Sequence, residues 1–285
     1  MNNILVTGGN GQLGSEIRGI ALNYSEYNFF FTDVKDLDIT NYTVVKEFIE
    51  VNNINIIINC AAFTTVDKAE SEPKLANLIN HLAVANFAKL AKHNNIKLIH
   101  ISTDYVFDGI NYKPYIETDI PNPQSVYGQT KLDGELAIQH FNPANSIIVR
   151  TSWVYSKFGN NFVKKMLSLA KENDSLNIIF DQVGSPTYAK DLANVILTII
   201  PQINNLNVET FHFSNEGVVS WYDFALAIFE IKKIPCNVNP ISTEQYPTPA
   251  KRPYYGLLNK AKIKQTYNID ISHWRDSLNQ ALKVF

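Results

Sequence analysis

The stretch that decides the fold is Thr7-Gly8-Gly9-Asn10-Gly11-Gln12-Leu13-Gly14. Two glycine patterns overlap in it, G-x-G-x-x-G from Gly9 and G-x-x-G-x-x-G from Gly8. In either pattern the glycines allow a tight turn, a close approach of the backbone to a pyrophosphate group, and close packing of the next helix. An apolar run, 3–7, precedes the turn and an amphipathic segment, 12–23, follows it. This context predicts a dinucleotide-binding turn between a strand and a helix.

Short apolar runs alternate with amphipathic segments through the first half of the chain, which is typical of βαβ units. We expect strands at 3–7, 28–33, 54–60, 97–102 and 146–151 and helices at 12–23, 42–52, 72–94 and 126–141. Because such crossovers are right-handed, they predict an α/β fold with a doubly wound, Rossmann-type parallel sheet.

The second half of the chain is less regular. We expect helices at 162–173, 189–200 and 221–231 and strands at 176–180 and 210–214. Five prolines between Pro235 and Pro253 predict a long loop without a packed element. Residues 1–151 should therefore form an NAD(P)-binding domain, and residues 152–285 a smaller C-terminal substrate-binding lobe with some segments returning to the first domain.

Composition excludes several classes of protein. The 285 residues carry 25 Lys and Arg against 27 Asp and Glu, so the net charge is −2. A chain with this charge balance has no excess of basic residues to bind nucleic acid or an anionic membrane. No apolar run is long enough to span a bilayer. Two cysteines and six histidines show no spacing typical of a zinc site. We expect a cytoplasmic protein.

Asp33 ends the second expected strand, 19 residues after Gly14 (33 − 14). A carboxylate at this position can accept hydrogen bonds from the ribose hydroxyls of the cofactor and repels a 2′-phosphate, which favours NAD. Lys35 partly offsets that repulsion. The choice between NADH and NADPH therefore stays open.

Tyr127 and Lys131 lie four residues apart in the expected helix 126–141, so they share a helix face. An ammonium beside the phenol would lower the pKa of Tyr127, and a positioned phenol can give a proton to a carbonyl oxygen as hydride arrives. Thr103, at the end of the fourth strand, is the natural second partner of that oxygen. A surface tyrosine and lysine is the alternative, but the glycine turn favours a nicotinamide oxidoreductase.

Several longer blocks carry a family resemblance over nearly the whole chain. They are the glycine turn, Asn59-Cys60-Ala61-Ala62-Phe63-Thr64-Thr65-Val66-Asp67-Lys68-Ala69-Glu70, Ser102-Thr103-Asp104-Tyr105-Val106-Phe107-Asp108-Gly109, Tyr127-Gly128-Gln129-Thr130-Lys131, Arg150-Thr151-Ser152-Trp153-Val154-Tyr155 and Arg252-Pro253. With these blocks the chain resembles the dTDP-4-dehydrorhamnose reductase family, within the extended short-chain dehydrogenase/reductase superfamily.

The resemblance implies NAD(P)H-dependent reduction of the 4-keto group of dTDP-4-dehydro-L-rhamnose to dTDP-L-rhamnose, the last step of dTDP-rhamnose synthesis. It implies a catalytic trio of Thr103, Tyr127 and Lys131. The cofactor would be bound by Gly8, Gly11, Gln12, Leu13, Gly14, Asp33, Asp38, Ile39, Ala61, Ala62 and Phe63, together with Tyr127 and Lys131. The dTDP-sugar would be contacted by Val66, Thr103, Asp104, Tyr105, Trp153 and Arg252, the last of these at the phosphates.

Some relatives in this family hold Mg²⁺ at a dimer interface, and Glu16 and Asp191 lie where such ligands could fall. Because Asp276 is the only acidic residue after Asp270, the carboxylate set is incomplete and no metal ligand is assigned. The oligomeric state, monomer or homodimer, is left open.

Two other functions remain open at this point. One is a regulatory subunit that binds a dinucleotide and a partner protein without catalysis, although such a role does not require the full trio. The other is a reductase, epimerase or dehydratase of a related nucleotide sugar. Dehydratases usually carry Glu after the aspartate of the fourth strand, whereas Tyr105 follows Asp104 here.

Overall fold

A parallel sheet forms the centre of the computed structural model, which describes residues 2–285. Its six strands within that range are β1 (Asn2–Thr7), β2 (Tyr27–Thr32), β3 (Ile54–Asn59), β4 (Lys97–Thr103), β5 (Ile147–Thr151) and β10 (Glu209–His212). Their spatial order is β10-β5-β4-β3-β1-β2, with every neighbouring pair parallel. The predicted doubly wound α/β sheet is confirmed.

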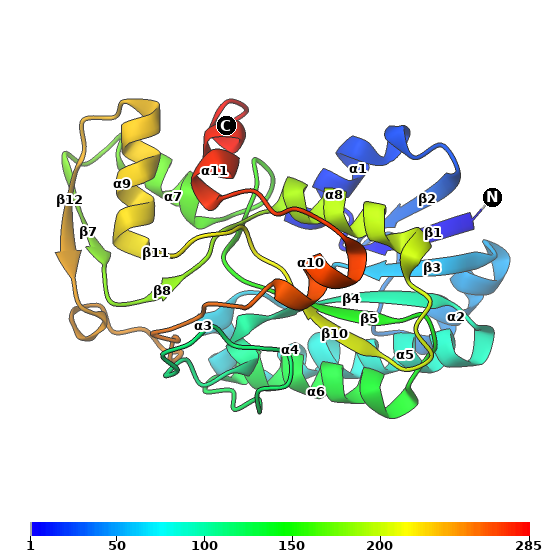
Figure 1. Ribbon diagram of the computed structural model, residues 1–285. Coiled ribbons are helices and arrows are strands. Elements are labelled where there is room, and N and C mark those ends of the chain that lie inside the picture. Colours follow the sequence, from blue (N-terminus) through cyan, green and yellow to red (C-terminus); the bar gives the residue numbers. More distant parts are fainter. Residues whose placement is uncertain (1) are drawn as a thin grey trace.

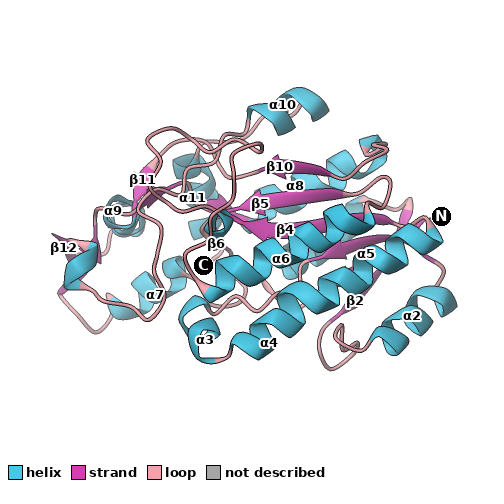
Figure 2. Ribbon diagram, turned by 90° about the horizontal axis from the view of Figure 1, so that it is seen from below, coloured by secondary structure: helices cyan, strands magenta, loops and turns pink. Residues whose placement is uncertain are grey.

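Helices cover both faces of this sheet (Figures 1 and 2). One face carries α1 (Gln12–Ile20) and α8 (Ala189–Ile199), and the other carries α2 (Tyr42–Val51), α5 (Ala83–Asn94) and α6 (Val126–Phe141). The strands alternate between two buried clusters: Ile4 and Val6 pack toward α1 and α8, whereas Leu5 packs toward α2 and α5. Both faces of the strands are therefore buried, which explains their nearly continuous apolar sequences.

The expected helix at 72–94 is interrupted. Its range holds α4 (Pro73–Asn77), a π-helical turn (Leu78–Leu82) and α5, and an unpredicted helix, α3 (Val66–Ser71), comes before it. Pro73 stands at the first position of α4, where the missing N–H costs no hydrogen bond, so it separates α3 from α4. The apolar periodicity continues across all of these elements and does not reveal the breaks.

The second lobe lies beyond the carboxyl ends of the sheet strands, at the left in Figure 1. It is built from short pieces: β6 (Val154–Tyr155), α7 (Phe162–Leu169), β7 (Ser175–Ile179), β8 (Val183–Gly184), β9 (Thr187–Tyr188), β11 (Val219–Ser220), α9 (Trp221–Lys232), β12 (Asn237–Ile241) and α11 (Trp274–Leu282). Three elements that also follow residue 151, β10, α8 and α10 (Ala261–Tyr267), instead contribute to the central sheet and its core.

The predicted loop from Pro235 to Pro253 is only partly correct. It contains β12, which pairs in parallel with β7. Pro240 lies inside β12, and a proline is tolerated there because each strand of a two-stranded sheet has a free edge. The prediction of no packed element in this range is therefore wrong. The helices α10 and α11 were not predicted either.

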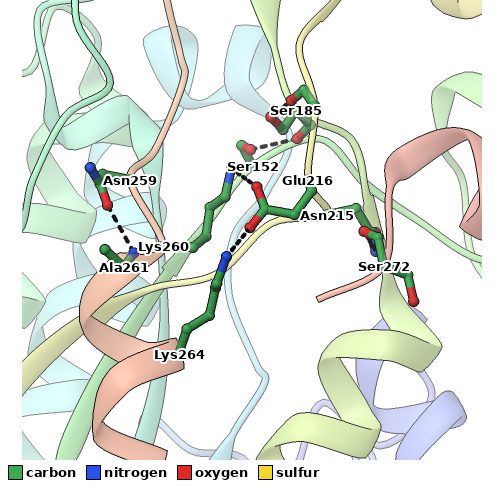
Figure 3. Close-up of polar contacts among 10 residues, drawn as sticks. Ser152, Ser185, Asn215, Glu216, Asn259, Lys260, Ala261, Lys264 and Ser272 are labelled. Atoms are coloured by element: carbon green, nitrogen blue, oxygen red, sulfur yellow. Dashed lines mark hydrogen bonds and ion pairs between the residues drawn. The ribbon is translucent and has the colours of Figure 1, made fainter. Parts of the chain in front are cut away.

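Glu216, four residues after β10, ties the C-terminal segments together (Figure 3). Its carboxylate lies 3.3 Å from Lys260 Nζ and 2.8 Å from Lys264 Nζ, at the start of α10. Its backbone N–H donates to the carbonyl of Ser272, and its own carbonyl accepts from the N–H of Trp274, each at 2.9 Å. One residue thus fixes α10 and the start of α11 against the end of the sheet. Within residues 2–285, no helix is both long and apolar enough to cross a bilayer.

The glycine turn leaves no room for side chains, which makes a substitution at Gly14 informative. A Cβ atom there would lie 2.3 Å from the carbonyl oxygen of Gly8. We expect Gly14→Ala to lower the free energy of unfolding by about 1–3 kcal/mol, measured by urea denaturation. Gly19→Ala is the matched control in the same helix, because its Cβ would meet nothing within 4 Å. It should raise stability by roughly 0.5–1 kcal/mol. Equal stability of the two variants would contradict the packing described for the turn.

Candidate active site

The crevice between β1 and β3 is where the direction of the chain across the sheet reverses. From β1 the chain passes through α1 to β2 on one side, and then through α2 to β3 on the other side of β1. Ligands of open α/β sheets bind at the carboxyl ends of strands at such a point. Here Gly8, with φ of +64°, is so close to β3 that a Cβ atom would lie 2.8 Å from the backbone nitrogen of Ala61. The two strand ends therefore form one continuous backbone surface.

Helix α1 begins at this crevice without a side-chain cap on its first backbone N–H groups. Gly11, at the N-cap, donates its own N–H to the carbonyl of Gly8 at 2.9 Å, which closes the turn. Uncapped N–H groups and the positive end of the helix dipole suit an anionic group. The turn therefore fits the pyrophosphate of a dinucleotide. Gln12 reaches across to the second lobe, where Asn161 Nδ2 donates to its side-chain oxygen at 2.9 Å.

The residues expected around the adenosine lie after β2. Asp33 accepts a hydrogen bond from the backbone N–H of Asn10 at 3.1 Å, so its carboxylate stands beside the glycine turn. Asp38 is exposed and accepts from the hydroxyl and N–H of Thr40, whereas Ile39 is half-buried against the cluster on the α2 side. Asp33 thus lies at the turn, and the other two lie farther along the same loop.

Thr103 and Tyr127 meet at the end of β4. Burial raises the Tyr127 pKa well above its usual value, and the neighbouring Thr103 hydroxyl, which favours the ionised form, opposes this only in part. Negative charge on the adjacent Asp104 adds to the increase. The expectation of a lowered Tyr127 pKa is therefore wrong in this structure, because a phenolate in a closed, apolar site loses its hydration.

Lys131 makes its contacts on the side of the sheet. Its Nζ donates to the carbonyl oxygen of Ile101 at 2.6 Å and lies 3.3 Å from His100 Nε2. Lys131 is completely buried, and burial lowers its pKa to about 8, although Glu135 and Cys60 oppose this. We expected the ammonium to lie beside the phenol of Tyr127. In the structure its hydrogen-bond partners are instead the Ile101 carbonyl and His100.

Asp104 is a buried carboxyl group at the same strand end. Its Oδ1 accepts a hydrogen bond from the Thr103 hydroxyl at 3.1 Å, and its Oδ2 has no partner within residues 2–285. A Cβ atom at Gly256 would lie 2.6 Å from this Oδ2. Burial raises the pKa of Asp104 to about 7, with the hydrogen bond from Thr103 acting against it. The site thus holds a carboxyl group that is partly protonated near neutral pH.

Two of the residues expected to contact the substrate pack against Tyr127, and a third lies beside one of them. Val66 and Tyr105 pack with its ring, and the Tyr105 and Tyr127 rings lie 5.5 Å apart, edge to face. Arg252 comes from the proline-rich loop and pairs with Asp67 Oδ2 at 2.8 Å, beside Tyr105. The loop is seated on the end of the β4 motif, where a Cβ atom at Gly109 would lie 2.3 Å from Pro253 Cβ.

Trp153 has an unusual backbone conformation, with φ of +48°. A bulky residue in the left-handed region is strained and persists only where its surroundings hold it. Its indole is stacked on Trp221 with ring centroids 3.5 Å apart, and Gly184 lies against its edge. Val183, directly before Gly184, accepts a hydrogen bond from the N–H of Gly256 at 2.8 Å, and Gly256 lies against Asp104. This segment therefore connects Trp153 with Asp104.

The comparisons with known proteins agree along the whole chain. The family model described as the RmlD substrate binding domain matches residues 1–285. The chain belongs to this RmlD family. A dTDP-4-dehydrorhamnose reductase of Aggregatibacter actinomycetemcomitans is 42% identical over 288 residues, covering 98% of this chain and 97% of the relative.

Solved structures of RmlD relatives superpose closely. A dTDP-4-dehydrorhamnose reductase of Clostridium acetobutylicum has a TM-score of 0.94 at 44% identity, covering 99% of each chain. Another, from Bacillus anthracis in complex with NADP, has a TM-score of 0.95 at 38% identity over 100% of each chain. The resemblance stated from the sequence motifs is confirmed.

Some residues of this RmlD site were not found from the sequence. Asn80, in the π-helical turn, is fully buried; its side chain accepts from the N–H of Phe63 at 2.8 Å and donates to the Phe63 carbonyl at 3.1 Å. It thereby fixes the backbone after β3. In the sequence, Asn80 stands within an apolar helical segment, and this polar residue at an apolar position is a signal that could have identified it. Asn59, His100 and Gly256 were missed because nothing local in the sequence reveals their partners across the fold.

The residues considered for Mg²⁺ are engaged within the chain. Glu16 Oε1 accepts from the Ser156 hydroxyl at 2.6 Å, and Asp191 Oδ2 accepts from Asn215 at 2.7 Å and from Ser277 at 2.5 Å. Across residues 2–285, no group of three or more His, Cys, Asp and Glu side chains is arranged to hold a metal ion.

The raised pKa of Asp104 has a measurable consequence for stability. Between about pH 4 and pH 7 the folded protein retains a proton on Asp104 that the unfolded chain has lost, so this group lowers stability as the pH rises through that range. Asp104→Asn removes this effect. We expect the stability of the variant relative to wild type, from urea unfolding, to increase from pH 4 to pH 7 and then to level off.

Asp108→Asn is the control with the opposite sign. The hydrogen bond from Tyr115 lowers the pKa of Asp108, so its carboxylate stabilises the fold above about pH 4 and this contribution is lost at lower pH. The variant should be less stable than wild type near pH 7, by a difference that shrinks in acid. If Asp104→Asn shows the same trend as Asp108→Asn, the assigned environment of Asp104 is incorrect.

Proposed function

We propose that the chain reduces the 4-keto group of dTDP-4-dehydro-L-rhamnose to a hydroxyl group, with NADPH or NADH as hydride donor. The observation that carries this is the pairing of Thr103 with Tyr127 at the end of β4, in a chain that matches dTDP-4-dehydrorhamnose reductases over nearly its full length. The product of this reaction is dTDP-L-rhamnose, so the step completes the synthesis of the activated sugar.

Tyr127 is the proton donor in this reaction. Because burial raises its pKa, the phenol is protonated throughout the neutral range and holds a proton ready for the carbonyl oxygen. Thr103 donates a second hydrogen bond to that oxygen and orients it. The alkoxide that forms on reduction is more basic than the phenol, so the proton moves from Tyr127 to the sugar oxygen in the same step.

The cofactor, when bound, supplies the hydride, and the chain holds it along the crevice. Gly8, Gly11, Gln12, Leu13 and Gly14 bind the pyrophosphate at the start of α1, where the helix has no side-chain cap. Asp33, Asp38 and Ile39 surround the adenosine, and Ala61, Ala62 and Phe63 line the path toward Tyr127. Lys131 binds the nicotinamide ribose.

The dTDP-sugar lies between the two lobes. Val66, Asp104, Tyr105 and Trp153 contact the sugar, and Arg252 binds the diphosphate through its guanidinium. The ion pair with Asp67 keeps Arg252 extended toward Tyr105, which supports this role. The boundary between the domains at residue 151, the cytoplasmic location and the oligomeric state, monomer or homodimer, stay predictions.

The activity is tested with dTDP-4-dehydro-L-rhamnose made in place from dTDP-glucose by the two preceding enzymes. Consumption of NADPH and of NADH is followed separately by absorbance. Oxidation of either supports the reductase. Binding of a dinucleotide without turnover would instead favour the regulatory subunit, and turnover only with another 4-keto-6-deoxy sugar would favour the related nucleotide-sugar enzyme.

Tyr127→Phe removes the proton donor and leaves the ring in place. We expect turnover to fall by about 10²- to 10⁴-fold, with the dissociation constant of the cofactor changed little. Tyr155→Phe is the control for the same chemical change, because the Tyr155 hydroxyl is buried without a partner within residues 2–285. It should retain wild-type turnover. Normal activity of Tyr127→Phe would reject Tyr127 as the acid.

Asp33→Ala tests how the cofactor is selected. The Asp33 carboxylate lies beside the glycine turn. Without it, the site no longer repels the 2′-phosphate of NADPH and no longer accepts hydrogen bonds from the ribose hydroxyls of NADH. We expect the ratio of kcat/KM for NADPH to that for NADH to rise by about tenfold or more, on the order of one charged hydrogen bond. An unchanged ratio would mean that Asp33 does not face the ribose.

A further inference from the structure

A chain of buried hydrogen bonds runs through the sheet beneath the cofactor crevice and ends at Lys131. The Thr7 hydroxyl, at the end of β1, contacts Asn59 Oδ1 at 2.7 Å. Asn59 Nδ2, at the end of β3, lies 3.1 Å from His100 Nδ1, and His100 Nε2 lies 3.3 Å from Lys131 Nζ. All four side chains are buried, with exposed fractions of 1% or less. The proton donor mechanism uses neither Thr7, Asn59 nor His100.

The backbone gives this chain a direction. At one end the N–H of Ala61, which can only donate, points at the Thr7 oxygen at 3.4 Å. The Thr7 hydroxyl donates its own hydrogen to Asn59 Oδ1. This leaves the Asn59 Nδ2 group, which can only donate, facing His100 Nδ1. At the other end the carbonyl of Ile101, which can only accept, takes a hydrogen from Lys131 at 2.6 Å.

This direction decides which nitrogen of His100 carries the proton. With Nδ1 accepting from Asn59, a neutral imidazole has its hydrogen on Nε2, the nitrogen that faces Lys131. An N–H is a good partner for the lone pair of an amine and a poor one for an ammonium, which has only donors. His100 itself stays neutral, because burial and the charge of Lys131 both lower its pKa.

We propose that His100, oriented by Asn59 and Thr7, is a positioning residue that turns an N–H toward Lys131 and thereby controls whether Lys131 carries a proton in the cofactor site. The other groups around Lys131 are Glu135 on its own helix and Cys60 after β3, and both favour the charged form. Glu135 is already held by Arg150 and Ser102. Burial is the main cause that lowers the pKa of Lys131 to about 8, so small changes in its hydrogen bonds can change its protonation near neutral pH.

The assignment of Lys131 to the nicotinamide ribose rests on the proposed function, but the hydrogen-bond chain does not. Its test therefore uses the cofactor-free protein. The pKa of Lys131 is measured by NMR of lysine labelled with ¹³C at Cε, and its signal is assigned with Lys131→Arg. No substrate is required, so a failed reductase assay and a failed test of the chain remain separate results.

Thr7→Val is the decisive variant, because it removes the hydroxyl that orients Asn59 and touches neither His100 nor Lys131. The bias toward an N–H on Nε2 is then lost, and we expect the pKa of Lys131 to rise by about half a unit to one unit. Thr32→Val is the matched control: Thr32 is the residue paired with Thr7 across the strands, and its buried hydroxyl has no partner within residues 2–285. It should leave the titration of Lys131 unchanged.

Asn59→Asp is a second variant of the same size that reverses the chain. A carboxylate can only accept, so the hydrogen of His100 moves to Nδ1 and is donated to it. Nε2 then becomes an acceptor, and the pKa of Lys131 should rise further than in Thr7→Val. The NADPH dissociation constant, measured against pH, should follow with an alkaline limb shifted in the same direction. An unchanged Lys131 pKa in Thr7→Val, or an equal shift in Thr32→Val, would overturn the proposal.

Discussion

No side chain fits between the glycine turn and the strands beside it, and the rest of the molecule depends on that constraint. A Cβ atom at Gly14 would overlap the turn itself, and one at Gly8 would overlap the backbone after β3. Because the backbones touch, α1 starts directly over the crevice between β1 and β3 with its N–H groups uncapped. The ends of β3 and β4 then lie beside the same crevice, which brings Ala61 and Thr103 to one site.

Loss of hydration governs the chemistry of the groups that line this site. Burial raises the pKa of Tyr127 and of Asp104, and it lowers the pKa of Lys131 and of His100. All four shifts favour the uncharged form. Tyr127 therefore keeps its proton at neutral pH, and the pKa of Lys131 lies at about 8, close to neutral pH. Charged groups that are structural, such as Arg150 and Glu135, are instead paired with each other at 2.6 Å.

The central sheet and the glycine turn were predictable from the sequence because local patterns encode them. The strand runs, the glycine turn and the four-residue spacing of Tyr127 and Lys131 depend only on neighbours in the chain. The contact of Lys131 with His100 and the raised pKa of Tyr127 depend on distant partners, and no local pattern reports them. The same holds for β12, whose Pro240 argues against a strand until its partner β7 is known.

The last strand of the central sheet comes from the second half of the chain. β10 pairs with β5, and Glu216 just beyond it anchors both α10 and the start of α11. A recombination event that exchanged everything after β5 would therefore also replace one edge of the sheet and part of its core. The two lobes therefore share one sheet and one core, and neither is a separate module that could be removed without opening the other.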